Sequence, residues 1–340
     1  MDGDPSAATP GPGVLASRDG RVGRLKIDRQ KALNALDLPM IRFIQRTLDL
    51  WREDDAVEAV VVEAEGRAFC AGGDIRAVRA QVLAGDYAAA EQFFAEEYVL
   101  NGAIARYPRP YVSLINGICM GGGLGISVHG THRIVTEAAV MAMPETAIGL
   151  APDIGASFFL PRLPGLLGTY LGLCGYRLQG PDIVHAGLGT AFVPSALLPA
   201  LSAALAQEGP DAIARFKAPP PPFRMQPEIG AIDRCFGADS MGEIVTRLEA
   251  EATPWSQSML AILRSMSPSS LCWSLASLRA GAQRSLEACL AAEFALVTRI
   301  IRYPDFAEGV RAMVVDKDRA PRWQPARIED VDPDFIATLV

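Results

Sequence analysis

Two carboxylates in apolar surroundings are the first residues of this sequence that could carry out chemistry. Glu145 lies in Met-Pro-Glu, and Asp153 follows eight residues later in Ala-Pro-Asp. Charged side chains in such surroundings are usually paired or functional. Burial raises the pKa of a carboxyl group, which suits a general acid or base near neutral pH. The alternative for either residue is a structural hydrogen-bond or ion-pair partner.

Two glycine-rich segments could supply the second part of a reaction centre. Arg67–Arg76 reads Arg-Ala-Phe-Cys-Ala-Gly-Gly-Asp-Ile-Arg, and Asn116–Gly125 contains three consecutive glycines. Each segment follows a strand-like run, so its backbone amides could approach a ligand closely. An oxyanion hole needs two such amides that converge on one oxygen atom. The alternative is that these glycines serve only a tight turn or the close packing of a helix on a strand.

Residues 18–31 form a basic segment in an acidic chain. They contain six Lys or Arg residues and two Asp residues, whereas the whole chain has a net charge of −7. A local excess of positive charge could attract a multivalent anion such as the phosphates of coenzyme A. The alternative is an exposed strand face on which each charge is simply solvated.

Several other chemistries lack their sequence signatures. We find no Walker A motif, no dinucleotide-binding fingerprint and no Gly-x-Ser-x-Gly nucleophile elbow. The six cysteines are scattered and only three histidines are present, so neither a metal site nor a disulfide framework is expected. The acidic balance argues against nucleic-acid binding, and no apolar run is long enough to predict a membrane span.

Strand-like and helical patterns alternate in the first half of the chain, which predicts an α/β fold. The predicted strands are Arg21–Asp28, Val57–Ala64, Tyr111–Ile115 and His132–Val135, and the predicted helices are Leu36–Trp51 and Gly123–His129. Longer helical patterns follow a four-proline run at Pro219–Pro222. The signals there are a capping box at Ser240, Ser267-Pro268 as the start of a helix, and the apolar helix Leu286–Ile301.

Taken in order, these motifs resemble the crotonase (enoyl-CoA hydratase/isomerase) superfamily. The resemblance rests on Leu25–Leu36, Ala68–Ile75, Asn116–Gly125 and Met143–Leu150, and it covers most of the chain except residues 195–240. It implies a ClpP-like spiral of ββα units with a helical C-terminal region. It also implies a thioester oxyanion hole made by the amides of Gly73 and Gly122, and coenzyme A contacts at Lys31, Asp74 and Ile75.

Within that superfamily the pattern is similar to the 3-hydroxyisobutyryl-CoA hydrolases of valine catabolism. Hydratases usually carry a second glutamate directly after the glycine run, where this chain has Gly125, and they usually have glycine where this chain has Asp153. Glu145 matches the other hydratase glutamate. Glu97 matches a position at which the hydrolases contact substrate. The resemblance therefore implies thioester hydrolysis, and an enoyl-CoA hydratase or isomerase is the alternative.

The roles implied by the resemblance leave two routes open. Glu145 either attacks the thioester carbonyl to form a mixed anhydride or activates water as a general base. Asp153 would bind the substrate hydroxyl or orient water, and Glu97 would help to position the substrate. The acyl-CoA is the expected partner, with coenzyme A as part of the substrate and no separate cofactor. Homo-oligomers are common in such families. A non-catalytic acyl-CoA-binding subunit is disfavoured, because both carboxylates are present.

The chain is expected to comprise three regions. Residues 1–17 would form a loose tail, residues 18–220 the spiral core and residues 221–340 the helical C-terminal region. The first 14 residues carry two Asp and no basic residue, unlike a signal or transit peptide, so we expect a cytoplasmic location.

Overall fold

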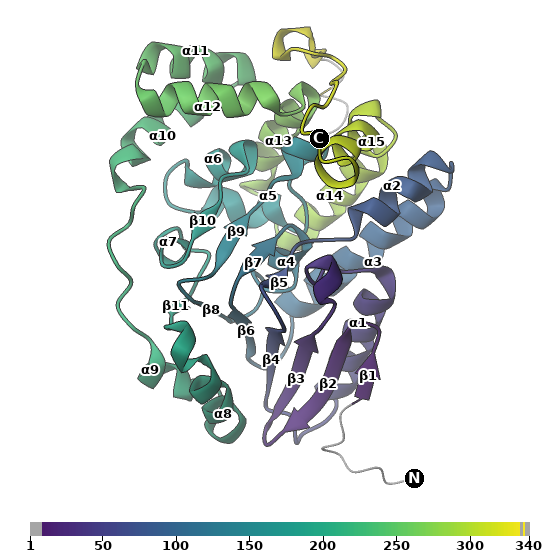
Figure 1. Cartoon of the computed structure of the whole chain (residues 1–340), viewed down its shortest axis with the longest axis vertical. Coiled ribbons are helices and arrows are strands. Elements are labelled where there is room, and N and C mark those ends of the chain that lie inside the picture. Colours follow the sequence, from purple (N-terminus) through teal and green to yellow (C-terminus); the bar gives the residue numbers. More distant parts are fainter. Residues whose placement is uncertain (1–8, 334–335, 337–340) are drawn as a thin grey trace. The chain divides into compact units, whose positions relative to one another are not determined.

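The computed structural model describes residues 9–333 and residue 336 (Figure 1). Its internal contacts divide the chain into two compact units. The first unit comprises the described residues up to Gly73 together with Glu96–Met141 and Leu178–Phe223. The second comprises Asp74–Ala95, Ala142–Arg177 and the described residues from Arg224 onwards. The chain therefore passes repeatedly from one unit to the other.

The first unit is built on a seven-stranded sheet with the order β1-β2-β3-β4-β6-β8-β11. Its strands are β1 (Thr9–Gly11), β2 (Val14–Asp19), β3 (Val22–Ile27), β4 (Ala59–Ala64), β6 (Tyr111–Ile115), β8 (His132–Val135) and β11 (Ala191–Phe192). The β1-β2-β3 pairs are antiparallel, and the pairs from β3 to β11 are parallel. Parallel strands of this kind are buried on both faces, which explains the run of valines in β4.

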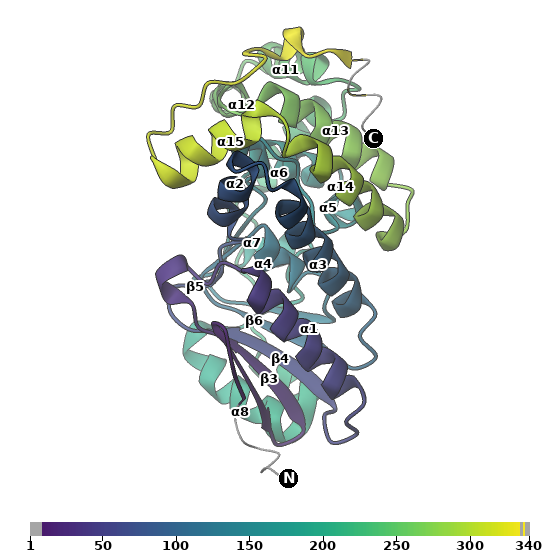
Figure 2. The ribbon, with the colours of Figure 1, turned by 90° about the vertical axis from the view of Figure 1, so that its right-hand side faces the viewer.

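Helices cover the two faces of this sheet. Figure 2 shows α1 (Leu38–Arg52) and α8 (Leu198–Glu208) on opposite sides of β3 and β4. The α1 helix begins where the Asp37 side chain accepts a hydrogen bond from the Met40 amide (3.0 Å). On the other face, Leu201 and Leu205 of α8 join the buried cluster that contains Val61 of β4. The remaining helices of this unit are short: α4 (Gly122–Gly125), α7 (Asp182–His185) and α9 (Ile213–Phe216).

A second, four-stranded sheet has the order β10-β9-β7-β5. Its strands are β5 (Ala68–Cys70), β7 (Ile118–Met120), β9 (Val140–Ala142) and β10 (Leu178–Gln179). Strands β5 and β7, which lie next to each other in this sheet, pair in parallel. Because parallel strands run in the same direction, the segments that follow them leave the sheet at the same edge.

The second unit is mainly helical. Its helices are α2 (Ile75–Leu83), α5 (Ala156–Phe159), α6 (Leu167–Cys174), α10 (Ile229–Phe236), α11 (Met241–Glu251), α12 (Pro254–Ser265), α13 (Pro268–Gly281), α14 (Leu286–Ile300) and α15 (Pro304–Val310). Helix α3 (Tyr87–Ala105) contributes residues to both units. Four of these helices begin at a hydroxyl side chain that accepts a backbone N–H three residues on, namely Ser240, Thr253, Ser267 and Ser285.

Most of the predicted elements are confirmed to within two residues, with two exceptions. The predicted helix Gly123–His129 is wrong beyond Gly125, where α4 gives way to a turn. There the Ser127 hydroxyl donates to the carbonyl oxygens of Gly123 (2.8 Å) and Leu124 (3.2 Å), an alternative to regular helix bonding. The predicted loose tail is wrong for residues 9–17, which belong to β1 and β2, and its residues 1–8 lie outside the described residues.

The predicted domain boundary at residue 220 stays a prediction. One passage between the two units occurs nearby, between Phe223 and Arg224. The units themselves do not follow a simple N-terminal and C-terminal order, because Asp74–Ala95 and Ala142–Arg177 also belong to the second unit.

None of the helices in the described part of the chain is both long enough and apolar enough to cross a membrane.

Gly168 and Gly242 give a test of helix packing in the second unit. A methyl group on Gly168 in α6 would overlap the carbonyl oxygen of Leu160, whereas one on Gly242 in α11 would have only the Ser240 hydroxyl at 4.0 Å. We expect Gly168→Ala to lower the free energy of unfolding by about 3 kcal/mol. Gly242→Ala should raise it by up to about 1 kcal/mol, because alanine favours helix. Urea unfolding measures both, and equal effects would contradict the packing described.

Candidate active site

The two glycine-rich segments lie against each other in the first unit. Strands β5 and β7 pair through Ala68 with Ile118 and Cys70 with Cys119, and the glycine loops follow directly. A methyl group built on Gly122 would lie 3.2 Å from the amide nitrogen of Gly73, and one on Gly72 would lie 3.8 Å from the amide nitrogen of Gly122. The structure therefore brings together the two amides that the resemblance predicted to act as one pair.

Glycine is required here for two separate reasons. Gly72 has a φ of +113°, a conformation that L side chains rarely adopt. A methyl group on Gly123 would overlap the carbonyl oxygen of Cys70, so the glycine run also permits the close approach of α4 to β5. The glycines therefore serve close packing, and this packing does not conflict with a role for their amides in binding a ligand.

Asn34 fixes a third segment against the first glycine loop. Its side-chain oxygen accepts the Arg29 amide (2.7 Å), and its side-chain nitrogen donates to the Ala68 carbonyl (2.7 Å). Two backbone bonds complete the attachment, from Leu36 N to Gly72 O (2.8 Å) and from Ala71 N to Leu33 O. Sequence reasoning placed Asn34 only within a matching stretch. Its positive φ of 59° and full burial show that it organises this loop.

The carboxylate of Glu97 lies next to the paired glycine loops. Glu97 is in α3 and only 2% exposed, and a methyl group on Gly122 would overlap its Oε1 atom. The preceding residue has a different role, because Glu96 forms a two-point ion pair with Arg42 (2.7 and 2.6 Å). The structure thus distinguishes two consecutive glutamates, and Glu97 is the one beside the amides of Gly73 and Gly122.

Asn101 is a buried polar residue that sequence reasoning missed. It lies four residues after Glu97 in α3 and is 0% exposed. Neither atom of its side-chain amide has a hydrogen-bond partner among the described residues. Buried amides are normally hydrogen-bonded. A water molecule or a polar atom of a substrate could therefore bind to the side chain of Asn101.

The cysteines beside the glycine loops are inert. Burial raises the pKa of the Cys70 thiol to about 12, and the charge of Glu97 contributes in the same direction. Burial likewise raises the pKa of Cys119. Because the thiolate is the nucleophilic form, neither residue provides a nucleophile near neutral pH.

Glu145 opens a 3₁₀ helix, η2 (Glu145–Ile148), in the second unit and is 6% exposed. The backbone around it is anchored by residues far along the chain. The Thr146 hydroxyl donates to the Leu173 carbonyl (3.0 Å), and the Thr146 carbonyl accepts the Ser267 amide (3.1 Å). The predicted carboxylate is therefore buried on a short, well-anchored turn.

Asp305 extends this anchor. Its Oδ2 atom accepts the Ser267 hydroxyl (2.6 Å), and its Oδ1 atom accepts the Gln324 amide (2.7 Å). Burial raises the pKa of Asp305, while these bonds act in the opposite direction. Ser267 and Asp305 thus hold the turn of Glu145.

Asp153 lies half-buried at the start of a second anchored loop. Its carbonyl accepts the Ala156 amide (2.9 Å), and the two intervening residues, Ile154 and Gly155, have φ angles of +57° and +87°. Glu293 of α14 accepts hydrogen bonds from the Gly155 amide (2.6 Å), the Ser157 amide (2.8 Å) and the Ser157 hydroxyl (2.5 Å). Sequence reasoning missed Glu293. The available signal was a lone carboxylate inside an otherwise apolar helical pattern.

The basic segment 18–31 is mostly neutralised. Four of its six basic residues form ion pairs, namely Arg21 with Glu58, Arg24 with Asp19 and Glu63, Lys26 with Glu65, and Arg29 with Asp37. Lys31 is exposed in the 3₁₀ helix η1 (Gln30–Ala32) and has no ion pair within the described ranges. An anion-binding role for this segment is therefore narrowed to individual residues such as Lys31.

The other two predicted coenzyme A contacts lie at the start of α2. Asp74 is the N-cap of this helix, and its side chain accepts the Ala77 amide (3.2 Å). Ile75 is the first helical residue. Of the predicted site residues, Gly73, Gly122, Glu97 and Lys31 belong to the first unit, whereas Glu145, Asp153, Asp74 and Ile75 belong to the second.

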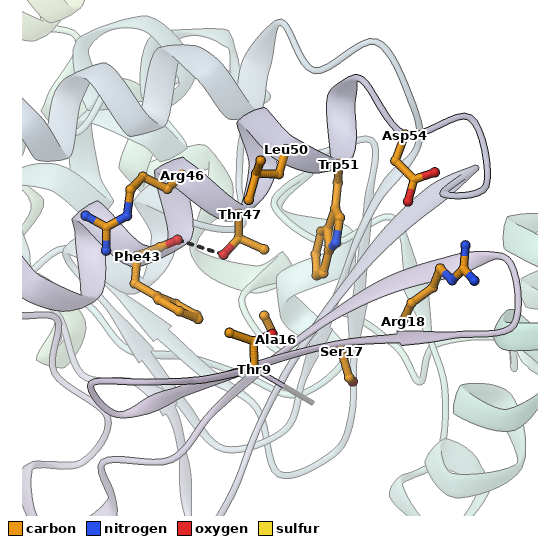
Figure 3. A pocket seen from close by; sticks show the side chains of 10 residues that line it. All are labelled: Thr9, Ala16, Ser17, Arg18, Phe43, Arg46, Thr47, Leu50, Trp51 and Asp54. Atoms are coloured by element: carbon orange, nitrogen blue, oxygen red, sulfur yellow. Dashed lines mark hydrogen bonds between the residues drawn. The ribbon is translucent and has the colours of Figure 1, made fainter. Parts of the chain in front are cut away.

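A surface pocket in the first unit is separate from all of these residues. Its volume is about 290 Å³, and it lies between α1 and the strands β1 and β2 (Figure 3). Figure 3 shows the rings of Phe43 and Trp51 pointing from α1 toward the strands, with Arg18 at one end. It contains none of the predicted catalytic or substrate-binding residues, so we do not assign it to the active site.

The α/β fold and the paired glycine loops agree with the family that a comparison of the sequence identifies. Residues 22–340 match the family model described as enoyl-CoA hydratase/isomerase, and the chain belongs to that family. The predicted superfamily and the predicted α/β fold with a helical C-terminal region are thereby confirmed.

Curated relatives narrow the comparison. The chain is 42% identical over 335 residues to the mitochondrial 3-hydroxyisobutyryl-CoA hydrolase of Xenopus tropicalis, covering 95% of this chain and 87% of the relative. It is 41% identical to 3-hydroxyisobutyryl-CoA hydrolase 1 of Arabidopsis thaliana, covering 95% and 90%. These names agree with the subfamily predicted from Gly125 and Asp153.

Two solved structures share the whole fold. An enoyl-CoA hydratase from Rhodobacter sphaeroides 2.4.1 superposes with a TM-score of 0.92 at 42% identity, covering 96% of this chain and 97% of that chain. A carnitinyl-CoA dehydratase from Mycobacterium thermoresistibile gives the same TM-score at 35% identity, with 96% of each chain covered.

Glu293 provides a test of the second unit through pH. Burial raises the pKa of this carboxyl to about 8, while the three hydrogen bonds lower it and the charge of Asp153 raises it further. The folded protein thus holds the proton of Glu293 more tightly than the unfolded chain does. This contribution to stability is complete below the pKa of the unfolded chain, near 4.5, and is lost as pH rises through the folded value.

We therefore expect the free energy of unfolding of the wild-type protein to fall, relative to Glu293→Gln, between about pH 5 and pH 8. Urea unfolding of both proteins across this range measures the difference between their free energies of unfolding, from which the contributions of other titrating groups cancel. If this difference did not change with pH, the raised pKa of Glu293 would be contradicted.

Proposed function

We propose that this chain hydrolyses the thioester of 3-hydroxyisobutyryl-CoA to 3-hydroxyisobutyrate and coenzyme A. The observation that carries the proposal is the contact between the Gly73 and Gly122 loops beside the buried Glu97. Two amides directed at one carbonyl oxygen suit a reaction in which that oxygen gains negative charge. The identity of 42% with hydrolases over nearly the whole chain supports the choice of substrate.

In the proposed reaction, the thioester oxygen accepts hydrogen bonds from the amides of Gly73 and Gly122. An oxygen nucleophile adds to the carbonyl carbon, the carbon–sulfur bond breaks, and coenzyme A leaves as its thiolate. A thiolate needs little acid assistance, because thiols ionise near pH 8.5. The reaction consumes one water and uses no cofactor beyond the coenzyme A of the substrate.

Glu145 is the proposed source of the nucleophile. It either attacks the carbonyl itself, so that water then cleaves the anhydride, or removes a proton from the attacking water. Its carboxylate is buried, so bulk solvent has little access to it. Asp153 is proposed to bind the substrate hydroxyl or to orient water, and Glu97 to position the acyl group beside the two amides.

Coenzyme A contacts are proposed at Lys31, Asp74 and Ile75. The exposed ammonium of Lys31 is the best suited of these to a phosphate. The cytoplasmic location and the formation of a homo-oligomer remain predictions, and several of the relatives carry the word mitochondrial in their names.

Enoyl-CoA hydration is the second candidate, favoured by the names of the two solved structures. A panel of 3-hydroxyisobutyryl-, 3-hydroxypropionyl- and crotonyl-CoA discriminates between the two functions. Release of free thiol from the first substrate, above that from the other two, supports the proposal. Loss of the enoyl absorbance of crotonyl-CoA without thiol release would instead establish a hydratase.

Glu145→Gln should lower kcat for thiol release from 3-hydroxyisobutyryl-CoA by about 100- to 10,000-fold, because the amide is neither a base nor a nucleophile. Glu329→Gln is the matched control, since Glu329 is an exposed glutamate of another 3₁₀ helix, η8 (Ile328–Asp330). The control should retain full activity. Near wild-type turnover by Glu145→Gln would remove Glu145 from the mechanism.

Gly122→Ala keeps the backbone amide but should displace it, so kcat should fall by up to about 100- to 1,000-fold, the usual cost of losing an oxyanion-hole donor. The added methyl group would displace the Glu97 carboxylate and crowd the Gly73 amide. Gly102→Ala is the control in the same unit, where the nearest atoms to the methyl group would belong to the flexible guanidinium of Arg106 (3.2 Å). Thermal unfolding verifies that both variants fold, and equal kcat values for the two would argue against the paired amides.

A further inference from the structure

Glu293 is a buried carboxyl group with no part in the proposed chemistry. It is 2% exposed and lies in the middle of α14, a helix whose other buried residues are apolar. Burying a carboxyl group is unfavourable unless hydrogen bonds compensate for the lost water. Among the described residues, the compensating hydrogen bonds come from Gly155 and Ser157, which lie two and four residues after Asp153.

The loop that Glu293 binds is strained. Ile154 has a φ of +57°, which is rare for a β-branched residue, and Gly155 follows with +87°. In this turn the Gly155 and Ser157 N–H groups both donate to Glu293, whereas the intervening Ala156 N–H donates to the Asp153 carbonyl. The carboxyl group of Glu293 therefore stabilises a conformation that is unfavourable for the loop by itself.

A second helix holds the loop from another direction. Gly281 at the end of α13 lies so close that a methyl group there would overlap the carbonyl oxygen of Ser157. The Ser157 backbone is therefore fixed by α13 through its carbonyl and by α14 through its amide. Asp153 precedes this fixed point, and its carbonyl bond to the Ala156 amide ties it to the same turn.

We propose that Glu293 is a positioning residue that fixes the place of the Asp153 carboxylate through the Gly155–Ser157 backbone. The inference rests on the proposed function, in which Asp153 contacts the substrate hydroxyl or water. Glu293 itself touches neither. A misplacement of about 1 Å in a reacting group can lower a rate about 100-fold, so the loop geometry matters for turnover.

A double-mutant cycle tests this inference. Glu293→Gln keeps the size of the side chain but directs an NH₂ group at a backbone N–H. We expect it to lower kcat/KM for 3-hydroxyisobutyryl-CoA about 30- to 100-fold in the otherwise wild-type protein. In the Asp153→Asn background the same change should cost less than about threefold, because residues that act through one another are not additive.

Glu287→Gln is the matched control, since Glu287 is an exposed glutamate of the same helix. It should leave kcat/KM unchanged. Equal losses from Glu293→Gln in both backgrounds would overturn the inference, because a general loosening of the fold does not depend on Asp153.

Ser157→Ala decides the matter if Glu293→Gln does not fold. It removes the 2.5 Å hydroxyl bond but keeps both amide bonds to Glu293. A loss of about tenfold, present only when Asp153 is intact, supports the inference, and an additive loss or none overturns it. Failure of the proposed function is distinguishable, because the wild-type protein would then release no thiol from 3-hydroxyisobutyryl-CoA.

Discussion

The close approach of two glycine loops is the constraint on which the first unit depends. Parallel pairing of β5 and β7 brings Gly72–Gly73 and Gly121–Gly123 to one edge of a sheet. The loops then approach until no side chain fits between them, as the overlap of a methyl group on Gly123 with Cys70 shows. This contact is what leaves two backbone amides beside the carboxylate of Glu97. Asn34 holds the neighbouring loop in a conformation that maintains the contact.

In the second unit, buried carboxyl groups hold the backbone next to the proposed catalytic residues in place. Asp305 holds the turn of Glu145 through Ser267, and Glu293 holds the loop of Asp153 through Gly155 and Ser157. Each buried carboxyl group accepts two or three hydrogen bonds, which offset the loss of its hydration. The unit therefore contains two kinds of acidic residue. Glu145 and Asp153 are proposed to act on substrate. Asp305 and Glu293 hold the backbone segments that carry Glu145 and Asp153.

A local excess of charge in the sequence predicted functional residues less reliably than a charged residue in an apolar stretch did. The basic segment 18–31 suggested an anion site, yet most of its cations pair with carboxylates from neighbouring strands and α1. Glu58, Glu63 and Glu65 lie far from this segment in the sequence, so a local charge count does not include them. By contrast, Glu145 is buried and Asp153 is half-buried, as charged residues in an apolar stretch predict when they are paired or functional.

The sequence by itself determined the family, the four strands β3, β4, β6 and β8, several helices, and the residue types of the proposed active site. It could do so because periodicity, glycine runs and isolated carboxylates are local patterns. Tertiary structure decided which carboxylates the basic segment pairs with, how Asn34 fixes the first glycine loop, and how the loop of Asp153 is held. Glu293 illustrates the reason: its bond to the Gly155 amide joins residues 138 positions apart. A contact over that separation leaves no periodic signal, because only the packing of α14 against the loop creates it.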